Sequence, residues 1–314
     1  MTCPDEAIAA EIARRHIGQT PNAVRRFTNG IQHYVYEVSF EQHAPLVVRM
    51  TVPSQRLAMV GAKTLSAALR PLGVPLPEIV ACELDDPFPW LILNRLPGTD
   101  IGDVLAHLDT EAIDRIARDV AKAQRNTAKL ETASRYGYAV HAQDAPHRSW
   151  SDVVSQHIAR SSKRIASAGL FDPSLVKRIE AFAHLARDEM KSIPAIPFLH
   201  DATVKNVIVT DEGQLSGIVD VDDLCFGDPR YSIALTLAAS IVRGLPDEYA
   251  ARLLHHGGHP DDWLFRFYVA VYLLDLMSEH GQDFNGNERK TTDLERNRIL
   301  ALYLDALARL GDRT

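Results

Sequence analysis

The sequence predicts an α+β protein of two lobes, with strands in the first part of the chain and helices in the rest. Short segments ahead of residue 98 alternate between apolar and other side chains, which is the period of a half-buried strand. Pro97 and Gly98 then interrupt the pattern. Beyond them, apolar residues recur every three or four positions, as in amphipathic helices. We therefore expect an N-terminal lobe at residues 1–97 and a helical lobe at residues 98–314.

The composition is that of a soluble globular protein with enough apolar residues for a large core. The chain has 314 residues, of which 46% are hydrophobic and 24% are charged. Its formal net charge of -7 argues against nucleic acid as a partner, because phosphate binding requires a basic surface. The sequence has no apolar run long enough to span a membrane, and its three cysteines are scattered. We therefore expect a cytoplasmic protein without disulfides.

The first strands of the N-terminal lobe are predicted to follow a tight turn. Aromatic and apolar residues alternate over residues 34–40, and Asn29 and Gly30 ahead of them form a typical turn sequence. Backbone N–H groups in such a turn can cover a phosphate, although a plain surface hairpin is the alternative. The other elements predicted in this lobe are helices at residues 4–16 and 55–69 and strands at residues 45–50, 73–82 and 90–98.

The second lobe is predicted to be almost entirely helical. Ile113, Ile116 and Val120 lie at helical spacing, and Thr110 is a suitable N-cap for the helix that contains them. Pro173 is well placed in the first turn of another helix, because proline is favoured there. The predicted helices span residues 110–130, 150–168, 172–190, 232–243, 247–255, 261–279 and 292–310.

The most informative stretch of the sequence is residues 198–231. A short loop begins at His200-Asp201 and ends at Asn206, and an apolar hairpin over residues 206–219 then leads to Asp220. The hairpin is expected to return the chain to the loop, so that two carboxylates and an amide oxygen meet. Oxygen ligands of this kind suit Mg²⁺, and a remaining carboxylate can accept a proton from a hydroxyl. This order of residues is typical of phosphoryl transfer.

The same residues resemble the catalytic core of the aminoglycoside phosphotransferase family, whose members are small-molecule kinases. In that family a loop of the form His-Gly-Asp-x-x-x-x-Asn precedes Gly-x-Ile-Asp and Gly-Asp-Pro. Leu199 occupies the usual position of the family's histidine, and His200 stands directly before Asp201. The matching residues are Asp201, Asn206, Gly217, Asp220, Gly227, Asp228 and Pro229.

The resemblance implies a two-lobed protein-kinase-like fold, with a small sheet-rich N-lobe and a larger helical C-lobe. It implies that Asp201 is the catalytic base, and that Asn206 and Asp220 bind Mg²⁺. The phosphate donor would be ATP or GTP. The acceptor would be the hydroxyl of a small molecule, such as an aminoglycoside or another cationic metabolite.

The resemblance also implies a nucleotide site in the first lobe. Asn29 and Gly30 would cover the phosphates, Arg49 on the third strand would pair with them, and the backbone from Asn94 to Leu96 would contact adenine. Two departures from the family stand out. The phosphate turn has a single glycine, and the helix at residues 55–69 has no glutamate to pair with Arg49. Gly61 falls near the position where such a glutamate is expected.

Two other functions fit the sequence. These departures are also compatible with a pseudokinase-like regulator that binds nucleotide without turnover. A metal-dependent hydrolase could use Asp201 and Asp220. The neighbouring Asp222 and Asp223 have two interpretations of their own, as further groups around the metal or cationic site or as a solvated acidic turn.

Overall fold

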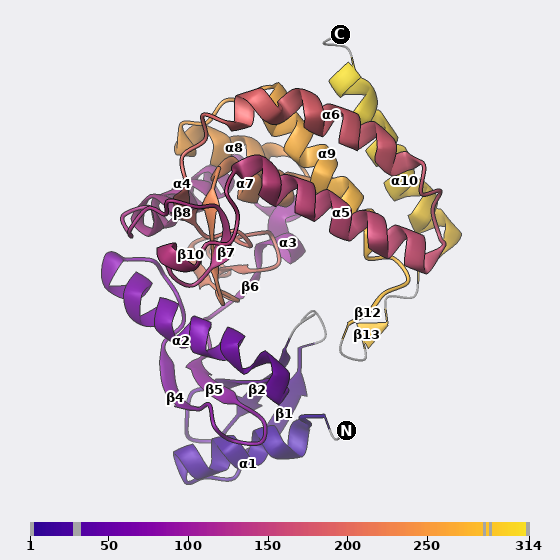
Figure 1. Cartoon of the computed structure of the whole chain (residues 1–314). Coiled ribbons are helices and arrows are strands. Elements are labelled where there is room, and N and C mark those ends of the chain that lie inside the picture. The colour runs from indigo at the N-terminus through magenta and orange to yellow at the C-terminus, as the bar shows by residue number, and fades with distance from the viewer. Residues whose placement is uncertain (1–2, 28–32, 285–286, 289–290, 312–314) are drawn as a thin grey trace.

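The computed structural model describes residues 3–27, 33–284, 287–288 and 291–311 of the chain. The molecule has two lobes: a smaller one built on a sheet, drawn at the bottom of Figure 1, and a larger helical one above it. The fold is α+β with a sheet-rich smaller lobe and a helical larger lobe, as predicted.

The small lobe is built on an antiparallel sheet with the strand order β1-β2-β3-β5-β4. Buried and half-buried residues alternate along β2, as the sequence predicts for a strand with one face in the core. β4 lies at the edge, where the neighbouring prolines are tolerated. The strands are β1 (Ala23–Arg26), β2 (Tyr34–Ser39), β3 (Leu46–Met50), β4 (Ile79–Glu83) and β5 (Trp90–Asn94).

Two helices cover the two faces of this sheet. α1 (Glu6–Ile17) packs on the face that carries Ile92, and α2 (Arg56–Leu69) packs on the face that carries Leu91. Adjacent residues of β5 therefore serve two separate cores, because side chains alternate across a strand. α2 lies on the side of the sheet that faces the large lobe (Figure 1).

The connection between the lobes passes close to the hairpin over residues 206–219. β6 (Thr99–Asp100) follows the first sheet and pairs with β9 (Val207–Val209). Gly98 has φ 95°, and a Cβ there would lie 1.9 Å from the carbonyl oxygen of Val209. Only glycine suits this position, because the backbone is left-handed and the next strand is in contact. The lobe boundary at residues 97 and 98 stays a prediction.

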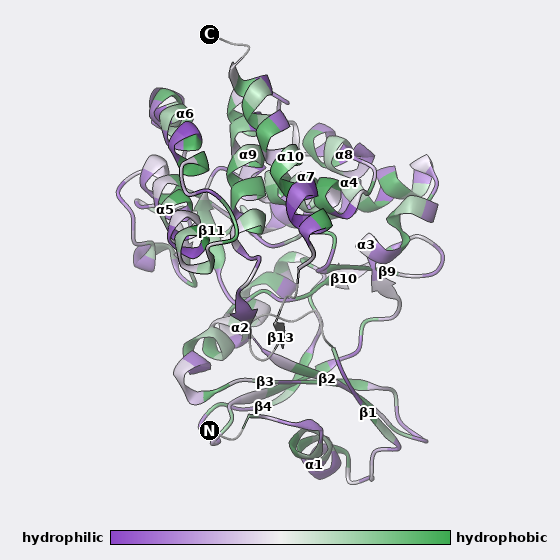
Figure 2. Ribbon diagram, turned by 90° about the vertical axis from the view of Figure 1, so that its right-hand side faces the viewer, coloured by the Kyte–Doolittle hydropathy of each residue, from purple (hydrophilic) through white to green (hydrophobic). Residues whose placement is uncertain are grey.

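The large lobe is a helical assembly around α9 (Trp263–Ser278), which is buried along nearly its whole length. Figure 2 shows α9 as a mainly hydrophobic helix flanked by helices with more hydrophilic residues. An all-apolar surface of this kind is expected for a central helix. The other helices are α3 (Ile101–Val104), α4 (Thr110–Thr127), α5 (Trp150–Ala168), α6 (Leu175–Met190), α7 (Arg230–Arg243), α8 (Glu248–Gly257) and α10 (Asp293–Gly311).

Three small sheets complete the fold. β10 (Leu215–Ile218), β9 and β6 form one sheet, and β7 (Gly137–Ala139), β11 (Leu224–Gly227) and β8 (Ile196–Phe198) form another. β12 (Asp283–Phe284) pairs with β13 (Asn287–Glu288) in a hairpin that extends from the large lobe toward the small one in Figure 1. β8 and β9 flank the loop that carries Asp201.

The structure corrects one predicted helix start. Asp109, rather than Thr110, is the N-cap of α4, and its side chain accepts a hydrogen bond from the backbone N–H of Ala112. Both residue types are good caps, so sequence alone separates the two positions poorly. The three cysteines, Cys3, Cys82 and Cys225, are all free thiols. Among the described residues, no helix combines the length and apolar character that crossing a membrane requires.

Candidate active site

The loop at residues 200–206 and the strand β10 that leads to Asp220 are called the catalytic loop and the metal strand after the roles predicted for them. The pairing of β9 with β10 holds the two together. The loop follows β8 and ends at Asn206, from which β9 begins. β10 then runs antiparallel to β9, and the backbone N–H of Val219 donates to the carbonyl of Asn206 at 2.9 Å. Asp220 is the next residue, so the hairpin brings it back beside the end of the loop, as predicted.

Both carboxylate oxygens of Asp201 have a partner in the loop. Thr203 Oγ1 donates to Oδ1 at 3.1 Å, and Lys205 Nζ lies 3.3 Å from Oδ2. Asn206 closes the loop by donating from Nδ2 to the backbone carbonyl of Asp201 at 2.9 Å. These contacts fix the direction of the Asp201 carboxylate and leave the side-chain oxygen of Asn206 available as a ligand.

Asp220 is held in a strained backbone conformation. Its φ is 63°, and it is the one non-glycine residue with positive φ among the described residues. Aspartate tolerates this region better than most residues, but such a conformation still costs ~1–3 kcal/mol and is often found at functional sites. The side chain is 40% exposed, and its Oδ1 accepts a hydrogen bond from Arg49 at 2.7 Å.

Arg49 of β3 is buried between two carboxylates. Its Nη1 lies 2.7 Å from Asp222 Oδ1, and its Nη2 donates to both Asp222 Oδ2 and Asp220 Oδ1 at 2.7 Å. Burial alone would lower the pKa of Arg49, but the charges of Asp222 and Asp220 outweigh it and raise that pKa. The residue predicted to bind nucleotide phosphates is therefore a fixed positive charge at the metal strand.

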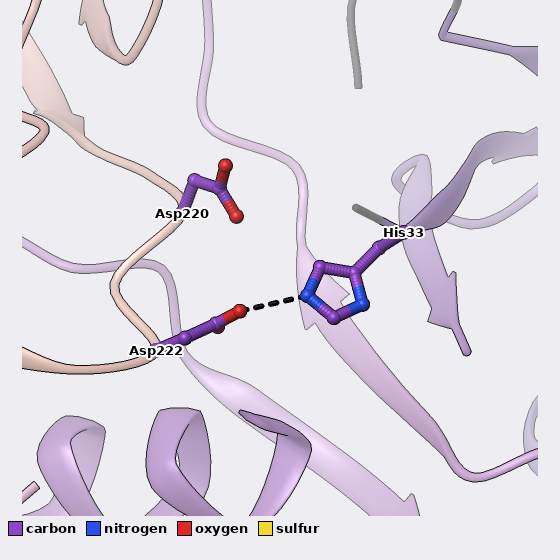
Figure 3. A group of neighbouring side chains, drawn as sticks. All are labelled: His33, Asp220 and Asp222. Carbon is purple, nitrogen blue, oxygen red and sulfur yellow. Dashed lines mark hydrogen bonds and ion pairs between the residues drawn. The ribbon is translucent and has the colours of Figure 1, made fainter. Parts of the chain in front are cut away.

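Asp222 is also in contact with His33, the residue directly before β2. His33 Nε2 lies 2.7 Å from Asp222 Oδ2 and donates to it, because an ionised carboxylate can only accept (Figure 3). Burial would raise the pKa of Asp222, but the charge of Arg49 and the His33 hydrogen bond hold it well below its usual range. The side chain of Asp222 is 13% exposed, so the alternative of a solvated turn is wrong for this residue.

Asp223 points in another direction and contacts the catalytic loop. Its Oδ1 lies 2.6 Å from His200 Nε2, and the His200 ring packs edge-on against Tyr138 with centroids 4.9 Å apart. Burial lowers the pKa of His200, but the hydrogen bond and charge of Asp223 more than compensate, with a smaller contribution from Asp201, and the pKa is raised. His200 thus braces the loop immediately before Asp201.

The donor set around Asp220 fits Mg²⁺. Asp220 is partly exposed, and the residue before it, Val219, is hydrogen-bonded to the backbone of Asn206. The carboxylate of Asp220 and the amide oxygen of Asn206 can therefore supply two hard oxygen ligands. His33, Asp220 and Asp222 also have ligand atoms within 4.8 Å of one another. That second group is a poor site for a cation, since Arg49 contacts both carboxylates and His33 is bound to Asp222.

Four further residues were predicted to contact the nucleotide, namely Asn29, Gly30, Asn94 and Leu96. Asn29 and Gly30 lie outside the described residues. The backbone N–H of Asn94 donates to the carbonyl of Glu78 at 2.9 Å, and its side chain also bonds to Glu78. The carbonyl of Leu96 accepts from the side chain of Arg95. Adenine binding by Asn94 and Leu96 stays a prediction.

Residues 23–266 match the model of the phosphotransferase enzyme family. The chain belongs to this family. The match covers the sheet, the catalytic loop, the metal strand and most of the helical lobe. Family membership supports a kinase-type phosphotransferase, and it agrees with the resemblance seen in residues 198–231.

Solved aminoglycoside phosphotransferases share the fold of this phosphotransferase. ADP-bound APH(2'')-Ib has a TM-score of 0.62 at 16% identity, and the alignment covers 96% of this chain and 97% of that one. A thermostable mutant of APH(4)-Ia in a ternary complex with AMP-PNP and hygromycin B has a TM-score of 0.67 at 17% identity, with 98% and 99% covered. The streptomycin–ATP complex of APH(2'')-IIa has a TM-score of 0.63 at 15% identity, with 98% and 97% covered. No curated protein sequence matches the chain.

Sequence reasoning missed Lys205 and His33 at this candidate site and left the role of Asp222 open. Lys205 lies inside the recognised loop, and its contact with Asp201 could have been suspected from the spacing alone. Burial lowers the pKa of Lys205, but the charges of Asp201 and Asp220 overcome this and raise it. The roles of His33 and Asp222 had no local signal, because they depend on each other across 189 positions of sequence.

Proposed function

We propose that this protein transfers the γ-phosphate of ATP, or of GTP, to a hydroxyl group of a small molecule. One observation carries the proposal: the hairpin joins Asp201, Asn206 and Asp220 at one place, each in an environment suited to its part. A base, two metal ligands and a buried strand cation form a complete set for phosphoryl transfer. The nucleotide-bound complexes of structurally similar proteins support the choice of donor.

Each residue has a distinct part in the proposed reaction. Asp201 accepts a hydrogen bond from the acceptor hydroxyl and takes its proton as the oxygen attacks. Lys205, held 3.3 Å from Asp201 Oδ2, adds positive charge beside the transferred group. Asn206 and Asp220 hold Mg²⁺, which when bound neutralises charge on the nucleotide phosphates. Arg49 supplies a further cation to the phosphates.

The acceptor is proposed to be a cationic hydroxyl compound, such as an aminoglycoside. The net charge of -7 favours positively charged partners, and Asp223 adds a partly exposed carboxylate next to the loop. Structurally similar proteins have been solved with gentamicin, streptomycin and hygromycin B. These three observations support the class of acceptor rather than one compound.

Substitution of Asp201 by asparagine tests the proposed reaction. Asparagine keeps the size of the side chain but loses its charge and its capacity to take a proton. We expect turnover to fall by ~10²–10⁴, while the affinity for Mg·ATP stays within about threefold of wild type. ATP binding would be measured by calorimetry, and phosphotransfer would be assayed on a panel of aminoglycosides, macrolides and amino alcohols.

The matched control is Asp211→Asn, in the exposed turn of the hairpin, which should keep both ATP binding and turnover. Near wild-type turnover in Asp201→Asn would contradict the mechanism. Binding of Mg·ATP by the wild type without transfer to any acceptor would favour a nucleotide-binding regulator instead. Cleavage of a substrate without added nucleotide would favour a metal-dependent hydrolase.

A further inference from the structure

Arg49 lacks the partner that a strand cation has in protein kinases. There, a glutamate on the neighbouring helix pairs with the cation and holds it for the nucleotide phosphates. The corresponding helix here, α2, carries no acidic residue at any position. A buried guanidinium still requires a carboxylate, because an unpaired charge in the interior is strongly disfavoured. The partner must therefore come from another element.

We propose that Asp222 takes the place of the absent helix glutamate and is the positioning residue for Arg49. This inference rests on the proposed function, since it assigns Arg49 to the nucleotide phosphates. Asp222 contacts both terminal nitrogens of Arg49 through both of its oxygens, at 2.7 Å in each case. The contact at Oδ2 is a hydrogen bond and the contact at Oδ1 is an ion pair, and together they hold the guanidinium at two points.

The two carboxylates around Arg49 differ in how firmly they are held. Asp220 makes a single contact to Arg49 and is 40% exposed, so it can turn toward a metal without leaving a buried charge behind. Asp222 is 13% exposed and is also bound by His33 at 2.7 Å. Asp222 is therefore the partner that Arg49 keeps when Asp220 binds Mg²⁺.

The absence of a glutamate on α2 has a steric cause that involves Asp222 itself. A Cβ at Gly61 would lie 2.2 Å from the backbone carbonyl oxygen of Asp222, well below the 3.0 Å that real Cβ contacts observe. The helix backbone is thus in direct contact with the main chain of Asp222. A side chain at position 61 would therefore require this backbone to shift, which disfavours a glutamate there.

These contacts also connect the two lobes. Asp222 follows β10 of the helical lobe, while Arg49 on β3 and His33 directly before β2 belong to the small lobe, 173 and 189 positions away in sequence. Figure 3 shows Asp222 directed at His33. The orientation of Arg49 is consequently set by the helical lobe, and Arg49 is in place only when the lobes are together.

The test is the binding of Mg·AMP-PNP to Asp222→Asn by titration calorimetry, which needs no acceptor. Asparagine keeps the shape but cannot neutralise the guanidinium, so we expect affinity to fall roughly tenfold or more. The control is Asp114→Asn on α4, since Asp114 likewise contacts arginines and a histidine but lies away from the site. Its nucleotide affinity should equal that of the wild type.

A double-mutant cycle separates positioning from general destabilisation. In an Arg49→Ala background, Asp222→Asn should change nucleotide affinity by less than about twofold, because there is no guanidinium left to position. Independent, additive losses would overturn the proposal. The Mg²⁺ concentration at half-saturation should be unaltered by Asp222→Asn, and a large increase would instead identify Asp222 as a metal ligand.

A second variant keeps the proposal testable if Asp222→Asn does not fold. Arg49→Lys retains the charge but loses the two-pronged contact, so it should weaken binding about as much as Asp222→Asn. Wild-type affinity in Arg49→Lys would contradict the proposed positioning. Failure of the wild type to bind Mg·AMP-PNP would overturn the proposed function itself, whereas equal binding by wild type and Asp222→Asn would overturn this inference alone.

Discussion

Replacement of Gly61 by alanine should disturb the contact between α2 and the main chain of Asp222. In an unobstructed helix this change stabilises a protein by ~1 kcal/mol, because alanine has the higher helix propensity. Here the new methyl group would lie 2.2 Å from the carbonyl oxygen of Asp222 and 2.9 Å from Val140 Cγ2. The first of these atoms belongs to the backbone, so the clash can be relieved only if α2 or the main chain of Asp222 moves. Overpacking of this kind costs ~1–3 kcal/mol, which leaves a net loss of up to about 2 kcal/mol.

The assay combines urea unfolding with calorimetric titration of Mg·AMP-PNP. We expect a lower free energy of unfolding than the propensity gain predicts, together with weaker nucleotide binding, because a displaced Asp222 no longer aligns Arg49. Gly311→Ala at the end of α10 is the control, since a Cβ there would meet no atom within 4 Å. The reasoning would be refuted if Gly61→Ala stabilised the protein by the full ~1 kcal/mol and bound nucleotide like the wild type.

Two further predictions concern the catalytic loop and the metal strand. Asp220→Asn should abolish phosphotransfer and leave the unfolding midpoint close to wild type, because asparagine tolerates the positive φ of this position; wild-type turnover at limiting Mg²⁺ would contradict a ligand role. The raised pKa of His200 means that its stabilising contribution is complete below about pH 6.5 and is lost as the pH rises through the folded-state value. The free energy of unfolding of the wild type should therefore decline above pH 6.5 relative to that of His200→Gln, as measured by urea titrations at several pH values. Parallel pH profiles for the two proteins would show that the charge on His200 does not stabilise the fold.

Much of the fold was predictable because its signals are local. α5 has the predicted bounds, since Ser149 and Asp152 form a capping box at one end and Gly169 ends the helix at the other. The proximity of Asp220 to the loop from Asp201 to Asn206 was predictable for a related reason. The hairpin between them is short, so the chain returns to the end of the loop. Strand β11 was missed, since all of its residues are buried and no alternation marks it.

The environment of Arg49 could not be predicted in the same way. The sequence indicated a basic residue on the third strand and a helix without glutamate. It did not show which carboxylate would pair with that basic residue instead. The answer depends on the distance between α2 and the metal strand, which a sequence pattern does not encode. The sequence left Asp222 open between a group near the metal or cationic site and a solvated turn, because its partners, Arg49 and His33, lie in the other lobe.

The close passage of Gly98 past Val209 determines how the lobes can move. Because the chain crosses between the lobes at a point in contact with β9, that point acts as a pivot next to the catalytic hairpin. A rotation about it would displace atoms in proportion to their distance from the pivot, so β1 at the edge of the first sheet would travel far while Asn206, one residue before β9, would hardly move. Such a rotation would leave the spacing between Asp201 and Asn206 unchanged.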